Sequence, residues 1–498
     1  MNLFTNLQRS INNSLKSNAF CINTMFYTYA DFAQIISNIR VAIKESINEN
    51  DSNIGLITND DIYTYASIVA LWLEGKAYIP LNPEFPLDRN VTVINQANIE
   101  SILDSSDTIV FSEFNSISTL NIKNYELNLK PSEVSNDTLA YIFFTSGTTG
   151  TPKGVPITFG NLSGFIEAQW ALDYTITAED RCLQMFELTF DLSVVSYLAP
   201  LLKGACVYTI PKDEIKYSYI FELMEDHELT YALMVPSILH YLRAYFNEIN
   251  CPSMKYSLFC GEALPLDVTE EWSKCVPNAT IANVYGPTEC TIYCMDYTFK
   301  RNCENKTHNG VLTIGKDMIN TSTIIVDDNN NEVAIGEPGE LCLSGVQLTP
   351  GYWQNEEKNK EVFFYKNHNG KETRFYRTGD LCSADKDGDV LYLGRVDFQA
   401  KIQGFRVELS EIEFHTKSAL NKMNAVALAF TNVINNTEVG LVIESKPMDT
   451  KQLLDYLNEK LPKYMIPTQI KFVDGFPLNT NGKTDRNALT QLFTNQYM

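Results

Sequence analysis

One ten-residue stretch constrains this chain more than any other: residues 145–154 read TSGTTGTPKG. Apolar and aromatic residues lead into it from Leu139 to Phe144, which predicts the end of a buried strand. Glycine and small hydroxyl residues let a backbone wrap closely around an anion, and their amides and hydroxyls donate to phosphate oxygens. Lys153 adds a point charge. The stretch therefore predicts a phosphate-binding loop rather than a flexible surface loop.

This loop differs from the P-loop of common NTPases. That pattern places a glycine directly before the lysine, whereas here Pro152 precedes Lys153 and Gly154 follows it. The stretch instead resembles the phosphate loop of the adenylate-forming superfamily, which includes acyl-CoA synthetases, luciferases and peptide-synthetase adenylation domains. The resemblance implies that Lys153 acts in catalysis and that ATP is bound by Thr145, Ser146, Gly147, Thr148, Thr149, Gly150 and Lys153.

Bulk composition narrows the classes of protein that the chain can belong to. Its 498 residues suit a large domain plus a smaller one. The net charge of −22 argues against a broad surface for nucleic acid or anionic membrane. Eleven cysteines lack the paired spacing of a zinc site, and no signal peptide or membrane span is evident. We therefore expect a cytoplasmic protein with reduced, mostly buried thiols.

Local patterns predict several elements. Residues 28–46 carry apolar residues at helical spacing, and residues 64–81 predict a helix ending near Gly75 followed by a short strand. Residues 327–331 (DDNNN) predict a turn between two strands, and residues 387–395 predict a hairpin.

Asp191 follows Phe190 in the apolar stretch FELTFDLSVV at 186–195. A carboxylate in such a place needs a partner. By sequence alone it is either the N-cap of the helix that follows or an anchor for a ligand. Amino-acid-activating members of the superfamily have a similar F-D-x-S, and this resemblance implies that Asp191 pairs with the α-ammonium group of an amino acid.

Further motifs match the superfamily in order, from about residue 28 to residue 486. They include LFCGEAL at 258–264, NVYGPTE at 283–289, FYRTGDL at 375–381 and GRVDFQ at 394–399. The resemblance implies that Glu289 helps to hold Mg²⁺ and that Asp380 takes the ribose hydroxyls. The remaining ATP-binding residues that it implies are Gly261, Glu262, Ala263, Asn283, Val284, Tyr285, Gly286, Pro287, Thr288, Tyr392 and Arg395.

The C-terminal motifs imply a second, moving part. Asp397 lies where relatives hinge, and Lys483, in FPLNTNGKTDR at 476–486, corresponds to the family's C-terminal catalytic lysine. Lys483 would contact both ATP and the amino acid. Gln403 departs from the usual K-I-R-G pattern, which puts one surface contact in doubt.

The expected fold is α/β: a large N-terminal adenylate-forming domain with several α/β subdomains, residues 1–396, and a small mobile α+β C-terminal domain, residues 397–498. The resemblance is strongest to the D-alanine–carrier protein ligases and then to peptide-synthetase adenylation domains. The amino-acid pocket that it implies is lined by Asp191, Leu192, Val195, Ser237, Leu258, Cys260, Val284, Ile292 and Tyr293, with Lys483 reaching in.

Apart from Asp191 this lining offers no charge, so we expect a small neutral substrate. D-alanine is the best candidate, with L-alanine or proline as alternatives, and Tyr293 would either shorten the pocket or stack with a ring. The expected reaction uses ATP and Mg²⁺ to form an aminoacyl-AMP and transfers it to the phosphopantetheine thiol of a separate carrier protein. A CoA ligase and a catalytically silent scaffold are the competing hypotheses, and Asp191 and the charged site residues argue against them.

Overall fold

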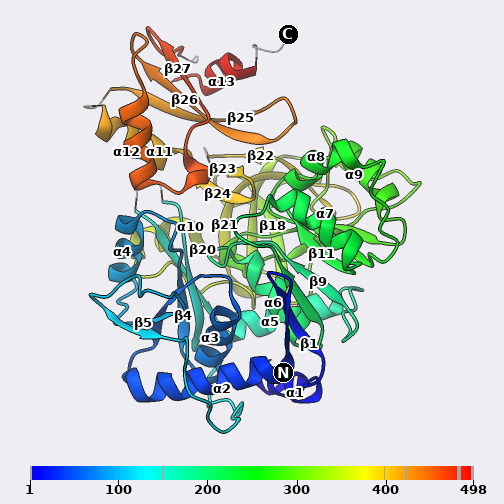
Figure 1. Ribbon diagram of the computed structural model, residues 1–498. Coiled ribbons are helices and arrows are strands. Elements are labelled where there is room, and N and C mark those ends of the chain that lie inside the picture. Colours follow the sequence, from blue (N-terminus) through cyan, green and yellow to red (C-terminus); the bar gives the residue numbers. More distant parts are fainter. Residues whose placement is uncertain (1–2, 148–150, 398, 421–422, 479–483, 495–498) are drawn as a thin grey trace.

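The computed structural model describes residues 3–147, 151–397, 399–420, 423–478 and 484–494. In Figure 1 a larger body, coloured blue to yellow, carries a smaller orange and red one that contains the C-terminal elements. Mixed sheets and helices build both bodies, which confirms the predicted α/β class. The boundary at residues 396 and 397 stays a prediction.

A nine-stranded sheet lies at the centre of the larger body, in the order β17-β14-β13-β12-β11-β9-β10-β1-β2. Its strands from β1 to β13 run parallel along that order, and β2, β14 and β17 are antiparallel to their neighbours. The bounds are β1 Asn18–Ile22, β2 Met25–Thr28, β9 Arg181–Gln184, β10 Cys206–Thr209, β11 Tyr231–Met234, β12 Tyr256–Phe259, β13 Thr280–Tyr285, β14 Met295–Thr298 and β17 Lys316–Asp317.

A six-stranded sheet in the order β6-β5-β3-β4-β7-β8 forms the second layer of this body. Only β8 is antiparallel to its neighbour, and the phosphate loop connects β7 to β8. The bounds are β3 Asn53–Ile57, β4 Ala77–Leu81, β5 Ser101–Asp104, β6 Asn115–Ser118, β7 Leu139–Thr145 and β8 Lys153–Thr158.

Helices pack between and around the two sheets, and their sequences explain where they start. α2 begins with a capping box between Thr28 and Asp31, and Asp61 caps α3. The bounds are α1 Leu3–Asn13, α2 Tyr29–Ser46, α3 Ile62–Leu73, α4 Leu87–Gln96, α5 Phe159–Ala171, α6 Leu192–Leu201, α7 Lys216–Asp226, α8 Ser237–Leu242, η1 Arg243–Tyr245, α9 Leu266–Cys275 and η2 Thr288–Cys290.

An antiparallel sheet and a small hairpin complete the larger body. The sheet has the order β18-β19-β21-β20, and β22 also pairs with β21. The bounds are β15 Thr307–His308, β16 Val311–Leu312, β18 Thr321–Val326, β19 Gly339–Gly345, α10 Glu356–Val362, β20 Phe363–His368, β21 Lys371–Ala384 and β22 Val390–Arg395.

The smaller body has its own apolar core, built around residues such as Ile412, Leu441 and Leu457. Its hairpin of β23 and β24 lies on the side that faces the larger body (Figure 1). The bounds are β23 Gln399–Ile402, β24 Phe405–Glu408, α11 Leu409–Ala419, β25 Ala425–Thr431, β26 Thr437–Glu444, α12 Lys451–Lys460, η3 Lys463–Met465, β27 Gln469–Val473 and α13 Arg486–Thr494.

Most local predictions are confirmed. The helix over 28–46 is α2, the helix and strand over 64–81 are α3 and β4, and the turn at 327–331 connects β18 to β19. The predicted hairpin at 387–395 is wrong in its bounds, because Ser383 on the long strand β21 already pairs with Leu391. All eleven cysteines lie in the described ranges; they are unpaired, and only Cys303 is exposed.

Within the described ranges, no helix has both the length and the apolar character that a membrane crossing requires. The cytoplasmic location stays a prediction.

Candidate active site

A cavity opens at the carboxyl ends of β12 and β13, where open parallel sheets bind ligands. The segments after these strands supply one wall, the start of α6 supplies a second, and the hairpin of β23 and β24 covers it. Its lining includes Asp191, Leu192, Cys260, Gly261, Tyr285, Gly286, Pro287, Thr288, Ile292, Asp380, Arg395, Lys401, Gly404 and Arg406. We call this the central cavity.

Asp191 stands at the N-cap position of α6, but its side chain makes no capping hydrogen bond. The residue is only 4% exposed, and its Oδ2 has no hydrogen-bond partner among the described residues. Burial raises the pKa of this carboxyl to about 7, although a hydrogen bond from Thr288 works against the rise. The carboxylate is therefore not used as a helix cap and is available to a ligand, which favours the second of the two interpretations made from the sequence.

A second cavity adjoins the central one and shares Tyr285 and Arg395 with it. We call it the side cavity. Four of the predicted ATP-binding residues, Glu262, Ala263, Asn283 and Tyr392, line it together with Lys401 and Asn436 from the smaller body. Ser237, which the resemblance assigns to the amino-acid pocket, also lines this cavity, and its role stays a prediction.

Asp380 lies between two partners at the border of the two cavities. Tyr285 donates its hydroxyl to one carboxylate oxygen, and Nη1 of Arg395 donates to the other over 2.7 Å. Arg395 also pairs with Asp397 over 2.6 Å. The predicted hinge residue is thus tied to the predicted ribose site by one guanidinium. The carboxylate of Asp380 already accepts hydroxyl and N–H donors, which is the chemistry that ribose hydroxyls would need.

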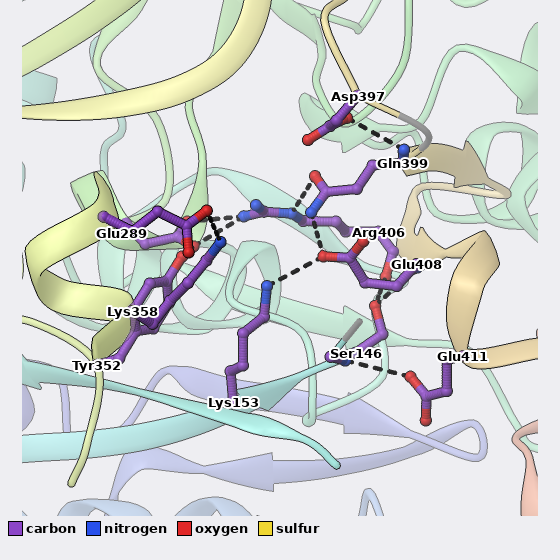
Figure 2. Close-up of polar contacts among 12 residues, drawn as sticks. Ser146, Lys153, Glu289, Tyr352, Lys358, Asp397, Gln399, Arg406, Glu408 and Glu411 are labelled. Atoms are coloured by element: carbon purple, nitrogen blue, oxygen red, sulfur yellow. Dashed lines mark hydrogen bonds and ion pairs between the residues drawn. The ribbon is translucent and has the colours of Figure 1, made fainter. Parts of the chain in front are cut away.

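The phosphate loop contacts the smaller body directly (Figure 2). Lys153 pairs with Glu408 over 3.0 Å. The hydroxyl of Ser146 donates to the carbonyl of Arg406 over 2.8 Å and accepts from the amide of Glu408 over 3.0 Å. The amide of Gly147 donates to Glu411 over 3.2 Å. In this arrangement three of the residues that the sequence assigns to phosphates, Ser146, Gly147 and Lys153, are bound to the backbone and carboxylates of residues 406–411.

Glu289 is completely buried, and its carboxylate accepts from Nη1 of Arg406 and from the hydroxyl of Tyr352 (Figure 2). Burial by itself would raise the pKa of Glu289, but Arg406, Tyr352 and Lys153 bring it down to about 2. The carboxylate is therefore charged and faces a cation. A charged oxygen donor suits Mg²⁺, so the residue fits the predicted role once Arg406 leaves.

The pKa of Lys153 is lowered in the same buried site. Burial lowers the pKa of its ammonium group and the positive charge of Arg406 lowers it further, while Glu408 acts in the other direction. The side chain is 9% exposed, and its ammonium group lies 5.6 Å from the centre of the Tyr352 ring. Two cations and two carboxylates thus share one buried site, which is a strongly charged place for a triphosphate to enter.

The structure brings most of the predicted residues together. Asp191, Leu192, Cys260 and Ile292 line the central cavity. Thr145 ends β7, and its hydroxyl is buried without a hydrogen-bond partner among the described residues. Four other predicted lining residues are buried but do not line the central cavity: Val195, Leu258, Val284 and Tyr293. Thr148, Thr149, Gly150 and Lys483 lie outside the described residues.

Sequence reasoning missed Arg406, Glu408 and Glu411, which bind the phosphate loop and Glu289. The signal was present in GFRVELSEIE at 404–413, where charged residues alternate with apolar ones directly after the KIQG motif. Tyr352 lies in the segment GELCLSGVQLTPGYW at 339–353, and no role was predicted for it. Its hydroxyl lies 2.5 Å from Glu289.

Comparison with known proteins agrees with this geometry. The AMP-binding enzyme family matches residues 7–353. D-alanine–D-alanyl carrier protein ligase of Bacillus licheniformis is 30% identical over 444 residues, which cover 86% of this chain and 87% of that protein. A linear gramicidin synthase protein of Brevibacillus parabrevis is 33% identical over 453 residues, 88% of this chain. The chain spans only 8% of that synthase and 13% of a plipastatin synthase protein of Bacillus subtilis.

Solved structures share the fold. A Vibrio cholerae adenylation domain in complex with glycyl-adenosine-5'-phosphate aligns with a TM-score of 0.86 at 24% identity, over 99% of this chain and 98% of that one. A nonribosomal peptide synthetase protein containing adenylation and PCP domains aligns with a TM-score of 0.85 at 20% identity, over 98% of this chain and 84% of that one. Together with the family match over most of the chain, the order of the motifs and the assembled site, these likenesses show that the chain belongs to the AMP-binding, adenylate-forming enzyme family.

Proposed function

We propose that this protein activates a small neutral amino acid as an aminoacyl-adenylate and transfers it to the phosphopantetheine thiol of a separate carrier protein. D-alanine is the substrate that we favour. The observation that carries the proposal is Asp191, a buried carboxylate on the lining of the central cavity with one oxygen that has no partner among the described residues. An α-ammonium group would supply the missing donors and neutralise the buried charge.

The choice of D-alanine rests on similarity and on the shape of the lining. The D-alanine–D-alanyl carrier protein ligase matches along nearly its whole length. Leu192, Cys260 and Ile292 surround Asp191 with apolar groups, which favour a short uncharged side chain. L-alanine and proline stay alternatives, because an apolar pocket separates neighbouring side chains by only about 1–3 kcal/mol per methylene.

The proposed first step joins two anions. An oxygen of the amino acid's carboxylate attacks the α-phosphorus of ATP, the bond to the bridging oxygen breaks, and pyrophosphate leaves with that electron pair. Lys153 and the hydroxyls and amides of the phosphate loop would hold the β- and γ-phosphates, and Asp380 would orient the ribose. Glu289 would hold Mg²⁺, which neutralises phosphate charge when it is bound. Lys483 would bridge the carboxylate and the α-phosphate.

In the proposed second step the thiolate of the carrier's phosphopantetheine attacks the carbonyl carbon of the adenylate. A thioester forms, the bond to the phosphate oxygen breaks, and AMP leaves. No side chain of the enzyme becomes covalently modified in either step. The enzyme's contribution is to position the reactants and stabilise charge.

ATP–pyrophosphate exchange across the twenty amino acids, D-alanine and a set of simple carboxylic acids tests the proposal. We expect exchange with D-alanine or another small amino acid, and its loss in Asp191→Asn. Loading of a purified phosphopantetheinylated carrier, compared with free CoA, then tests the acceptor. Exchange with carboxylic acids lacking an amino group, or unchanged exchange in Asp191→Asn, would overturn the assignment to amino acids.

A further inference from the structure

The inner wall of the central cavity contains a strained segment. Thr291 and Ile292 follow the short helix η2, and their φ angles are +49° and +75°. Side chains branched at Cβ rarely adopt positive φ, so the surroundings must hold this backbone in place. Ile292 lines the cavity. The segment therefore presents a wall residue to the ligand at a cost in conformational energy, which its surrounding contacts must offset.

One buried amide holds the backbone of this segment. Gln347 has no exposed surface, and its Nε2 donates to the carbonyls of Tyr293 over 2.9 Å and Cys290 over 3.3 Å. The hydroxyl of Thr291 donates to the carbonyl of Gln347 over 2.5 Å. Gln347 thus sets where the chain runs, because its side-chain amide bonds to main-chain carbonyls.

A second buried amide holds the side chain of Tyr293. The hydroxyl of Tyr293 donates to Oε1 of Gln169 on α5, and both residues are fully buried. The Tyr293 ring also meets Phe165, four residues earlier on α5, edge to face at 4.9 Å between centroids. Positions four apart lie on one face of a helix, so the same face of α5 contacts both the ring and the hydroxyl of Tyr293.

Tyr293 belongs to the layer of residues directly behind the cavity lining. A Cβ built on Gly286, which lines the cavity, would lie 2.4 Å from the Cα of Tyr293. Tyr293 also directly follows Ile292, which lines the cavity. The backbone of Tyr293 is therefore packed directly against residues that line the cavity.

The buried amide of Gln169 lowers the stability of the core around it. Its Nε2 has no hydrogen-bond partner among the described residues although the side chain is fully buried. A half-bonded buried amide destabilises a core, and an apolar side chain of the same size would avoid that cost. The oxygen of the same amide, Oε1, accepts the hydrogen bond from Tyr293, and we attribute the presence of the amide to this contact.

We propose that Gln169 is a positioning residue for substrate selection: it fixes Tyr293 so that the ring closes the inner end of the amino-acid pocket and limits the substrate's side chain to about the size of a methyl group. This inference rests on the proposed function and deepens it. It assigns selectivity to a residue on α5 that does not line the cavity and that was not among the predicted pocket residues.

The test compares Gln169→Met, which removes the acceptor at nearly constant volume, with Tyr293→Phe, which removes the donor. ATP–pyrophosphate exchange is measured for the best small substrate and for valine and leucine of the same configuration. We expect the ratio of kcat/KM for the larger to the smaller substrate to rise about tenfold or more in both variants. The double variant should show no further rise, and Gln169→Met should keep or raise the Tm.

Gln347→Met is the matched control, because it removes a buried amide that holds backbone instead of the ring. It should lower the Tm and reduce exchange with all substrates alike. If Gln169→Met behaves in the same way, with a lower Tm and an unchanged substrate ratio, the positioning role is overturned. An active wild type with unchanged ratios in both variants overturns this inference alone, whereas a wild type silent with every amino acid overturns the proposed function as well.

Discussion

Nη1 of Arg406 donates to both carboxylate oxygens of Glu289, over 2.9 and 2.8 Å. The guanidinium comes from β24 of the smaller body, and the carboxylate belongs to the larger one. Burial would lower the pKa of Arg406, but Glu289 raises it, so the pair is charged. One strand of the small body therefore occupies the acidic residue that we assign to the metal of MgATP.

Arg406→Gln should consequently lower the KM for ATP. When another group occupies a site in part of the molecules, only the remaining molecules can bind the ligand. The apparent affinity is then the intrinsic affinity multiplied by the fraction of molecules whose site is open. Removing the guanidinium should raise that fraction, and we expect a three- to tenfold fall, on that order, in the KM for ATP in the exchange reaction. Arg243→Gln, on the surface and paired with Glu271, is the control. A rise in the KM would mean that Arg406 itself binds ATP.

Asp191 predicts a pH dependence. Burial raises its pKa to about 7, so the carboxyl is mostly neutral below that value and cannot pair with an ammonium group. We expect kcat/KM for the amino acid to rise about tenfold per pH unit up to about pH 7 and then level off. Steady-state exchange from pH 5.5 to 8.5 measures this. A flat profile below pH 7 would contradict the assignment of Asp191 to the ammonium group.

Asp191→Asn should stabilise the protein while abolishing its activity. The folded pKa lies above the ordinary Asp value of 3.8, so the folded state binds more protons than the unfolded one between about pH 4 and pH 7. Stability from this group is thus present at low pH and is lost as the pH rises through about 7. The neutral amide avoids that loss, and the gain in Tm over the wild type should grow from pH 4.5 to pH 8. Thermal unfolding at both pH values measures it, and an equal difference at both would contradict the buried charge.

Lys153 should matter for chemistry more than for folding. Its ammonium group contacts Glu408 in this structure, but both partners are held independently by their own strands. Lys153→Met should lower kcat/KM for exchange about 10²- to 10³-fold, as expected when one preorganised donor is removed from a developing charge. Lys203→Met, at an exposed position near Trp170, should leave the rate unchanged. A similar effect in both variants would point to a general loss of charge.

The sequence was sufficient to predict the α/β class of the fold and the residues on short motifs. TSGTTGTPKG and NVYGPTE each join a strand to a turn, so local patterns locate Lys153 and Tyr285 at strand ends and Glu289 shortly after one, where ligands bind. At Asp191 the sequence does not separate a helix cap from a ligand anchor, because both need a polar residue before an apolar helix. The structure favours the ligand anchor, because the side chain of Asp191 makes no capping hydrogen bond to α6.

The contacts between the two bodies could not be predicted in the same way. Glu289 and Arg406 are 117 positions apart, and Ser146 and Glu408 are 262 apart, so no local periodicity connects them. The surroundings of Ser237 depend on such contacts as well. Its amide donates to Glu262, whose carboxylate also accepts from the amide of Gly404, and both Ser237 and Glu262 line the side cavity. Which of two adjacent cavities a residue faces depends on packing across the sheet.

Lys483 gives the last prediction, which concerns the order of the two steps. Residues 399–408 cover the central cavity and occupy Lys153 and Glu289, so ATP can take these groups only after this hairpin withdraws. We expect the smaller body to move about Asp397 between the steps, as hinged domains do around ligands. Lys483→Ala should then abolish adenylate formation and leave thioester formation from preformed aminoacyl-adenylate within about threefold of the wild type. Exchange and single-turnover carrier loading measure the two steps separately. Equal losses in both would contradict an alternation between two arrangements, because a lysine needed in only one of them cannot slow the other.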